Sequence, residues 1–222
     1  MSKILAVICA LLATILLASC GGGGDDDNTP GARLRVLHAS PDAPAVDVYV
    51  DGTKVLSDVT YPTVSSYLNV RAGSHVIKVN AAGTSTTVIN VNPSLAAGGA
   101  YTAIAANFLA NIQALLATDE TTAPPAGQAR VRVIHAAPDA GPVDVLVNGQ
   151  AVLTNVPFGA ISNYLTLPAG TYDVKVNAAG TSTTAIEATL TVAAGTNYSA
   201  VAIGSIKTAQ TNPLAIKVLT DG

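Results

Sequence analysis

Residues 46–52 have the sequence VDVYVDG, and this short stretch decides the fold class. Its three valines alternate with Asp47 and Tyr49, which is the period of two that a half-buried β-strand shows. Asp51-Gly52 follows directly and is a strong signal for a tight hairpin turn, because both central residues of such a turn take positive φ. The stretch therefore predicts a β-hairpin, since its period is two and not the 3.6 of a helix.

This stretch belongs to a segment that occurs twice in the chain. Residues 33–43 return as residues 130–140, at an offset of 97 residues, and residues 78–87 return unchanged as residues 175–184. Self-similarity over this length indicates a duplicated structural unit. We therefore expect two domains of the same fold.

Within one copy, turn signals separate short apolar segments at regular spacing. The strands expected after the first hairpin cover residues 65–70, 74–80, 84–91, 100–107 and 113–118. The first two of these are expected to pair as a second hairpin. Seven or eight short strands over about 90 residues predict an all-β chain with two tandem immunoglobulin-like or transthyretin-like β-sandwich domains. In the alternative interpretation, residues 108–116 form a short helix.

The N-terminus has the pattern of an export signal. Lys3 precedes an apolar run at residues 4–17, which is shorter than the about 20 residues that a membrane-spanning helix needs. The run ends in Leu17-Ala18-Ser19-Cys20, which resembles the lipobox of bacterial lipoproteins. In that class the leader is removed and the cysteine is acylated, with palmitate for example, and several acyl chains on one residue anchor a protein stably. The alternative is an ordinary secreted protein in which Cys20 is incidental.

A flexible tether is expected between the anchor and the first domain. After Cys20 come four glycines and three adjacent aspartates, which cannot bury a core. Gly21 follows the cysteine, rather than the Asp that resembles an inner-membrane retention signal in enteric bacteria, so the outer membrane is the expected location. The expected segments are the signal peptide at 1–19, the lipidated tether at 20–31, the first β-sandwich at 32–120, a Pro-rich linker at 121–129 and the second β-sandwich at 130–222.

Charge and cysteine content exclude several classes of function. Eleven Lys and Arg against fourteen Asp and Glu give a net charge of −3 without a clustered basic face, so no nucleic-acid partner is expected. Both cysteines lie within the first twenty residues, so the processed chain is expected to have no disulfide, no thiolate metal site and no cysteine nucleophile. The sequence has no glycine-rich phosphate loop and no Cys/His zinc spacing, and no cofactor is expected.

Residues 38–52, HASPDAPAVDVYVDG, resemble the opening signature of a bacterial and archaeal family, domain of unknown function 4397. The Ala72-Gly73 turn and the strand at 76–79 fit the same family, and the resemblance covers both copies. The second copy departs from the pattern at Gly141-Pro142 and at Asn148. The resemblance implies an exported or lipid-anchored protein that often carries the domain in tandem. It implies no activity and no catalytic residue.

One histidine and two aspartates recur in both copies and form the sharpest candidate site. They are His38, Asp42 and Asp47 in the first copy and His135, Asp139 and Asp144 in the second. Imidazole and carboxylate groups suit a divalent metal, but no third or fourth ligand recurs at a fitting place. In the structural alternative, which we favour, each histidine lies on the inward face and hydrogen-bonds turn backbone, while Asp42 stabilises a turn. No metal is therefore predicted.

The recurring charged residues of the strands are expected on the outer surfaces of the sheets. Successive strand residues point to opposite faces, so Arg33, Arg35 and Lys78 point away from the apolar residues beside them. Asp47 also points outward. We therefore expect a cross-strand ion pair between Asp47 and one of these cations on a solvent-facing sheet surface, repeated at Asp144.

Enzymatic and sugar-binding chemistry find little support in the sequence. Residues 83–87, GTSTT, lack the closing glycine of a nucleophile elbow and lie on a predicted turn and strand. Stacking on sugars favours exposed aromatic side chains, whereas the chain has no Trp and seven Tyr. The tyrosines that recur, such as Tyr67 and Tyr164, are expected to pack in the cores with their hydroxyls hydrogen-bonded.

The expected function is that of a non-enzymatic module of the cell envelope for adhesion, surface structure or partner binding. It contacts the membrane through its N-terminal lipid, and an envelope protein or a glycan is the candidate partner. A glycan-binding or metal-ligand-binding lipoprotein is the alternative, and an envelope hydrolase is the third hypothesis.

Overall fold

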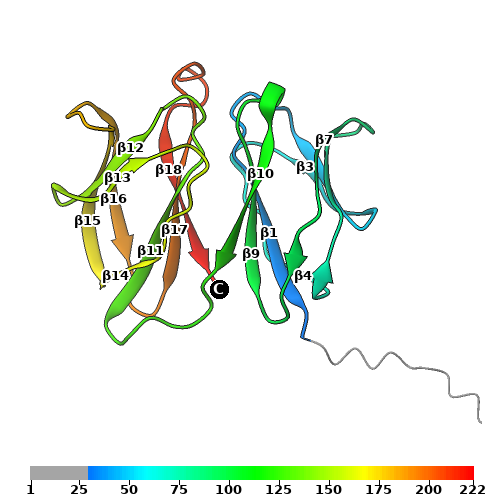
Figure 1. Cartoon of the computed structure of the whole chain (residues 1–222), viewed down its shortest axis with the longest axis horizontal. Coiled ribbons are helices and arrows are strands. Elements are labelled where there is room, and N and C mark those ends of the chain that lie inside the picture. Colours follow the sequence, from blue (N-terminus) through cyan, green and yellow to red (C-terminus); the bar gives the residue numbers. More distant parts are fainter. Residues whose placement is uncertain (1–29) are drawn as a thin grey trace, which may run out of the picture.

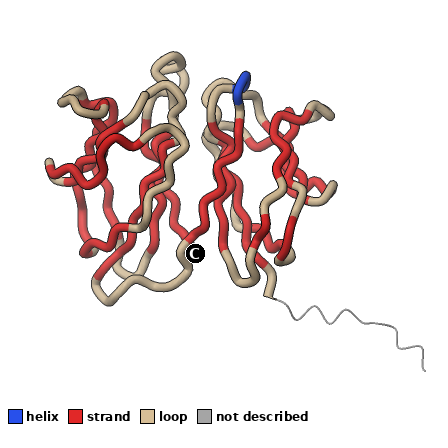
Figure 2. The backbone as a smooth tube through the Cα atoms, in the orientation of Figure 1, coloured by secondary structure: helices blue, strands red, loops and turns tan. Residues whose placement is uncertain are grey.

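The computed structural model of the chain describes residues 30–222. The expected signal peptide, Cys20 and nearly all of the expected tether lie outside the described residues. The described part is built from β-strands, with one short 3-10 helix, η1 (Leu109–Asn111) (Figures 1 and 2). Among residues 30–222, no helix is long and apolar enough to cross a membrane.

The first repeat is a β-sandwich. Its strands are β1 (Ala32–His38), β2 (Val46–Val50), β3 (Thr53–Val59), β4 (Leu68–Val70), β5 (Gly73–Ser74), β6 (Ile77–Ala81), β7 (Thr87–Val91), β8 (Ser94–Leu95), β9 (Ala100–Ala106) and β10 (Gln113–Asp119). One sheet has the order β10-β9-β1-β4, and the sheet packed on it has the order β3-β2-β6-β7. β5 and β8 form a separate two-stranded sheet.

The second repeat has the same arrangement. Its strands are β11 (Gln128–His135), β12 (Val143–Val147), β13 (Gln150–Val156), β14 (Leu165–Pro168), β15 (Gly170–Ala178), β16 (Thr184–Val192), β17 (Asn197–Ile203) and β18 (Ala215–Asp221). The two sheets have the orders β14-β11-β17-β18 and β13-β12-β15-β16.

Strand pairing is equivalent in the two repeats. β1 pairs in parallel with β9, and β11 pairs in parallel with β17. The registers match, because Leu34 lies opposite Tyr101 and Val131 lies opposite Tyr198. The predicted all-β fold class of two β-sandwiches is confirmed, although the sequence did not indicate the parallel pairing.

The predicted hairpin between residues 65–70 and 74–80 is wrong. β4 pairs with β1 in one sheet, whereas β6 pairs with β2 and β7 in the other. The chain crosses between the sheets near Gly73, whose φ of 126° is readily available only to glycine. The crossover lets β4 and β6 bury their apolar sides against opposite faces of one core. The helix considered at residues 108–116 is limited to η1, and β10 follows it.

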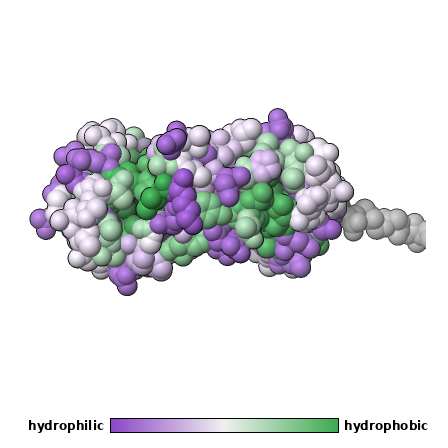
Figure 3. All heavy atoms as spheres, turned by 90° about the horizontal axis from the view of Figure 1, so that it is seen from above, coloured by the Kyte–Doolittle hydropathy of each residue, from purple (hydrophilic) through white to green (hydrophobic). Residues whose placement is uncertain are grey.

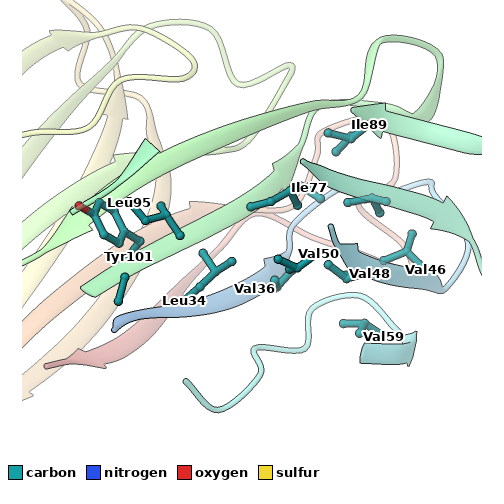
Figure 4. Close-up of a cluster of buried hydrophobic side chains, with 13 residues drawn as sticks. Leu34, Val36, Val46, Val48, Val50, Val59, Ile77, Ile89, Leu95 and Tyr101 are labelled. Carbon is teal, nitrogen blue, oxygen red and sulfur yellow. The ribbon is translucent and has the colours of Figure 1, made fainter. Parts of the chain in front are cut away.

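The interiors of the two sandwiches differ. In the first repeat the buried apolar residues form one continuous cluster that includes Leu34 and Ile77 (Figure 4). In the second repeat they form two smaller clusters, one that contains Val176 and one that contains Val131. The buried apolar residues of the second repeat are therefore less continuous than those of the first.

A fourth apolar cluster lies between the repeats. The sheets that contain β1 and β11 turn their outer faces toward each other at the centre of the molecule (Figure 1). The cluster consists of equivalent residues from both repeats: Leu37, Ala39, Ile104, Ala106 and Ala117 from the first, and Ile134, Ala136, Val201, Ile203 and Leu219 from the second. Each is at most 4% exposed. The two repeats thus share one buried interface with an approximate two-fold relation.

Candidate functional site

The candidate histidines, His38 and His135, lie at the ends of β1 and β11 and are fully buried. The Nε2 atom of His38 donates a hydrogen bond to the Pro44 carbonyl at 3.0 Å, and that of His135 donates to the Gly141 carbonyl at 2.8 Å. These are backbone contacts of the kind that the structural interpretation expects. Burial lowers the pKa of both imidazoles, because the charged form loses its hydration.

Asp42 and Asp139 hold the loops that precede the last strand of each repeat. The Asp42 carboxylate accepts a hydrogen bond from the backbone N–H of Leu109 at 2.7 Å. The Asp139 carboxylate accepts from the backbone N–H groups of Ile206 and Lys207, both at 2.9 Å. Each aspartate therefore ties the loop after its repeat's first strand to the β9–β10 or β17–β18 loop at the same end of the sandwich.

Asp47 forms a cross-strand ion pair, but with a different cation from those expected. Its carboxylate accepts from the Lys54 Nζ atom of β3 at 2.7 Å, and not from Lys78 or an arginine of β1. It also accepts from the backbone N–H groups of Asp58 and Gly83. The Lys54 contact and then the two N–H groups lower the pKa of Asp47 to about 2. The expected solvent-facing position is wrong, since the Asp47 side chain is only 4% exposed.

Asp144 keeps the backbone contacts of Asp47 without the lysine. It accepts from the backbone N–H groups of Asn155 at 2.7 Å and Gly180 at 2.9 Å, and these donors lower its pKa. Ala151 takes the place of Lys54 in the second repeat. What both repeats share is therefore the backbone bridging by the aspartate, and the ion pair is an addition in the first.

The structure does not gather the three candidate residues of a repeat around one point. His38 contacts the loop after its own strand, Asp42 binds the β9–β10 loop, and Asp47 binds β3 and the turn after β6. In the part of the chain that the structure describes, no group of three or more His, Cys, Asp or Glu side chains is arranged to hold a metal ion. The positions of these residues fit a structural role.

The pKa shifts of the three histidines predict that the free energy of unfolding decreases on both sides of about pH 6.5. Because the pKa values of His38 and His135 are lowered on folding, the unfolded chain binds more protons below pH 6.5, and the free energy of unfolding decreases as the pH falls. His75 has the opposite sign. Its ring donates to the Asp51 carboxylate at 2.7 Å, which raises its pKa, so its contribution is complete below 6.5 and is lost as the pH rises through the folded-state value.

Urea unfolding between about pH 5 and pH 8 measures this dependence. We expect the free energy of unfolding of the double variant His38→Gln, His135→Gln to depend less on pH below 6.5. We expect that of His75→Asn to depend less on pH above 6.5. An unchanged acid side in the double variant would contradict the assignment to the buried pair.

A buried polar network joins the two repeats. Arg35 of β1 pairs with Asp221 of the second repeat, and Arg132 of β11 pairs with Asp119 of the first. Each arginine also donates to the backbone carbonyl of the residue before that aspartate, at 2.7 and 2.6 Å. The four charged side chains are at most 6% exposed. The pairing is reciprocal, so each repeat supplies one cation and one anion to the other.

Hydroxyl groups complete the network. The Asp119 carboxylate accepts from the hydroxyls of Tyr67 at 2.6 Å and Thr102 at 2.7 Å. The equivalent donors to Asp221 are the hydroxyls of Tyr164 and Ser199, both at 2.6 Å. Burial and then the carboxylate contact raise the pKa of both tyrosines. Because a buried charged group is costly unless it is paired and hydrogen-bonded, this set of donors offsets the burial of the four side chains.

Sequence reasoning missed this network in two respects. It predicted Arg35 on the outer face of a sheet, which is where Arg35 and its counterpart Arg132 lie, but it did not anticipate that the other repeat covers that face. It also missed Asp119 and Asp221, which both follow a threonine at the end of the last strand. They are 102 residues apart rather than 97, because the β17–β18 loop is longer than the β9–β10 loop. An alignment with a gap in this loop would have paired them.

The interface also places two loops of different repeats in contact. We call the surface formed by residues 107–112 and 204–212 the loop face. Lys207 Nζ lies 5.2 Å from the ring centroid of Phe108, so the two loops meet across the repeats. Leu109 is 38% exposed and Ile206 is 59% exposed on this surface. Figure 3, which views this end of the molecule, shows two apolar areas with hydrophilic residues between them.

The fold and the interface define a class of protein: a tandem pair of β-sandwiches joined face to face, with exposed loops of both at one end. The family described as Domain of unknown function (DUF4397) matches residues 32–145 and 129–221. The chain therefore belongs to this family. None of the curated proteins matches it.

Two solved structures are similar to the chain at low sequence identity. The first is CBMbc, of family CBM26, from Eubacterium rectale Amy13K in complex with maltoheptaose; identity is 10%, the match covers 86% of this chain and 97% of that chain, and the TM-score is 0.26. The second is a leucine-rich repeat protein from Bacteroides thetaiotaomicron, with 14% identity, coverage of 79% and 26%, and a TM-score of 0.20. At these TM-scores, neither likeness informs the ligand of this chain.

Proposed function

We propose that this chain is a non-enzymatic binding module of the bacterial cell envelope, anchored in the outer membrane by lipid on Cys20. Its binding site in this proposal is the loop face, and its partner is another envelope protein. The observation that carries the proposal is the buried Arg–Asp network between the repeats. That network fixes the orientation of the two repeats, and the contact of Lys207 with Phe108 brings one loop of each repeat into a surface that neither repeat has alone.

The position and chemistry of the loop face support this function. The start of β1, from which the tether would lead to the membrane, lies at the opposite end of the first sandwich from η1, so anchoring leaves the loop face accessible (Figure 1). Exposed apolar side chains such as Leu109 and Ile206 are typical of protein-binding surfaces when they gather on loops held by a rigid scaffold.

A protein partner fits the loop face better than a sugar does. Within residues 107–112 and 204–212 the single aromatic side chain is Phe108. Its ring faces Lys207, so it does not offer the open platform on which sugars stack. The candidate acids Asp42 and Asp139 are occupied by backbone N–H groups of these loops, which supports a scaffolding role over a catalytic one.

Cysteine labelling in intact cells tests the loop face even though the partner protein is unidentified. Ala110→Cys and Ala209→Cys place one thiol on each loop, and Thr189→Cys on the exposed side of β16 serves as the control. Because a bound partner excludes the reagent, we expect both loop cysteines to react with a maleimide several-fold more slowly in cells than in the purified protein. Each rate is first divided by that of the Thr189→Cys control in the same sample. Equal normalised rates in cells and in purified protein would contradict the proposal.

A further inference from the structure

The second repeat has an apolar cavity between its two sheets. Its volume is about 400 Å³, which lies within the range of small-molecule sites. Its walls come from both sheets and include Val133, Val147, Leu165 and Leu190. Leu165 on the edge strand β14 is 38% exposed, so the cavity is open to solvent at this edge.

Comparison with the first repeat shows why this cavity is larger than its counterpart there. Leu34 and Ile77 of the first core are replaced at equivalent positions by Val131 and Val174, and both valines line the cavity. Each replacement removes one carbon from the interior. Val36 and Val50 are buried in the first repeat, whereas their counterparts in the second repeat are only half-buried. The inter-sheet cavity of the second repeat, of about 400 Å³, is therefore larger than that of the first, of about 230 Å³.

The chemistry of the walls restricts the ligand. None of the described residues that line the cavity is charged, and hydroxyl groups come only from Thr166 and Tyr172. The Tyr172 hydroxyl is already used, since it donates to the Pro168 carbonyl at 2.7 Å. An apolar cavity of about 150 Å³ suffices to bind benzene, so this larger one accommodates a longer apolar molecule. A charged or strongly polar ligand would lose its hydration there without compensation.

We propose that this cavity binds an aliphatic chain, with any polar head group left in solvent at the edge beside β14. The proposal does not depend on the loop face, with which the cavity shares no residue. Valine and leucine side chains make up most of the wall, which suits the flexible methylene units of an acyl chain. A free fatty acid and the acyl chain of a phospholipid both supply this chemistry.

Titration with cis-parinaric acid, a fluorescent fatty acid, tests the proposal. The protein is the chain from residue 20 onward with Cys20→Ala, so that no attached acyl chain competes. We expect saturable binding with one site per chain. Displacement by dodecanoate alone would identify a free fatty acid as the ligand, and displacement by lysophosphatidylcholine as well would identify a lipid acyl chain.

The first repeat supplies the decisive variant. Val131→Leu with Val174→Ile restores the residues of the first repeat and narrows the cavity, so we expect it to weaken binding several-fold while the midpoint of urea unfolding stays the same or rises. The matched control is Ala114→Val, which narrows the smaller inter-sheet cavity of the first repeat, of about 230 Å³, and should leave binding unchanged. Absence of saturable binding to the parent protein, or unchanged binding in the double variant, would overturn the proposal.

Discussion

Replacing Arg132 by Met is expected to lower the free energy of unfolding by about 3–5 kcal/mol, because it leaves the buried Asp119 carboxylate without its main cation. The Asp119 side chain is fully buried and that of Arg132 is 2% exposed, so water cannot replace the lost partner. The hydroxyls of Tyr67 and Thr102 still donate to the carboxylate, and Arg35 Nη2 lies 3.8 Å from it, but Arg35 is already paired with Asp221. The interface between the repeats should weaken at the same time.

Urea unfolding tests this prediction by comparing the Arg132→Met variant with a variant of an exposed ion pair. Lys175 and Glu187 form an ion pair at 3.2 Å with exposures of 43% and 69%, so Lys175→Met should cost no more than about 1 kcal/mol. Removing both partners with Arg132→Met and Asp119→Leu should cost less than the single change, because no unpaired charge remains. Equal costs for Arg132→Met and Lys175→Met would show that the network does not hold the repeats together.

The network also gives the binding proposal its physical basis. A contact made only of apolar side chains would hold the sheets together but would tolerate sliding, whereas charge pairs with hydrogen bonds to defined atoms fix orientation. In this proposal the loops that carry Leu109 and Ile206 keep one relative position, since the repeats are fixed in orientation and Lys207 contacts Phe108. A partner that contacts both loops then binds a preorganised surface and loses little free energy to ordering it.

The fold could be predicted from the sequence because its signals are local. The alternation around Val48 and the Asp51-Gly52 turn determine strand and hairpin within a few residues, and the duplication repeats both. The prediction of a hairpin around Gly73 was wrong because strand pairing there joins segments that are distant in the sequence. The segments on either side of Gly73 look like a hairpin, but their strands join different sheets, and nothing within the segments specifies which neighbour each strand takes.

The candidate polar residues could be found from the sequence, but most of their partners could not. The backbone acceptor of His38 lies six residues away, whereas Asp42 binds the N–H of Leu109, 67 residues away, and Arg35 pairs with Asp221, 186 residues away. The cavity was missed for another reason. Leu34 and Val131 both fit an inward-facing strand position, and only the packed structure shows that the loss of a carbon is left unfilled.

Membrane fractionation of Cys20→Ala is the most direct test of the proposed envelope module, since the access of the loop face to partners depends on the lipid anchor. The wild-type chain should incorporate labelled palmitate and stay with the membranes through a high-salt wash, because several acyl chains on one cysteine bind a bilayer stably. Cys9→Ala, which changes the other cysteine of the chain, should behave like the wild type. We predict that Cys20→Ala incorporates no palmitate and leaves the membrane fraction completely; an acylated or membrane-retained Cys20→Ala chain would contradict the proposed anchor.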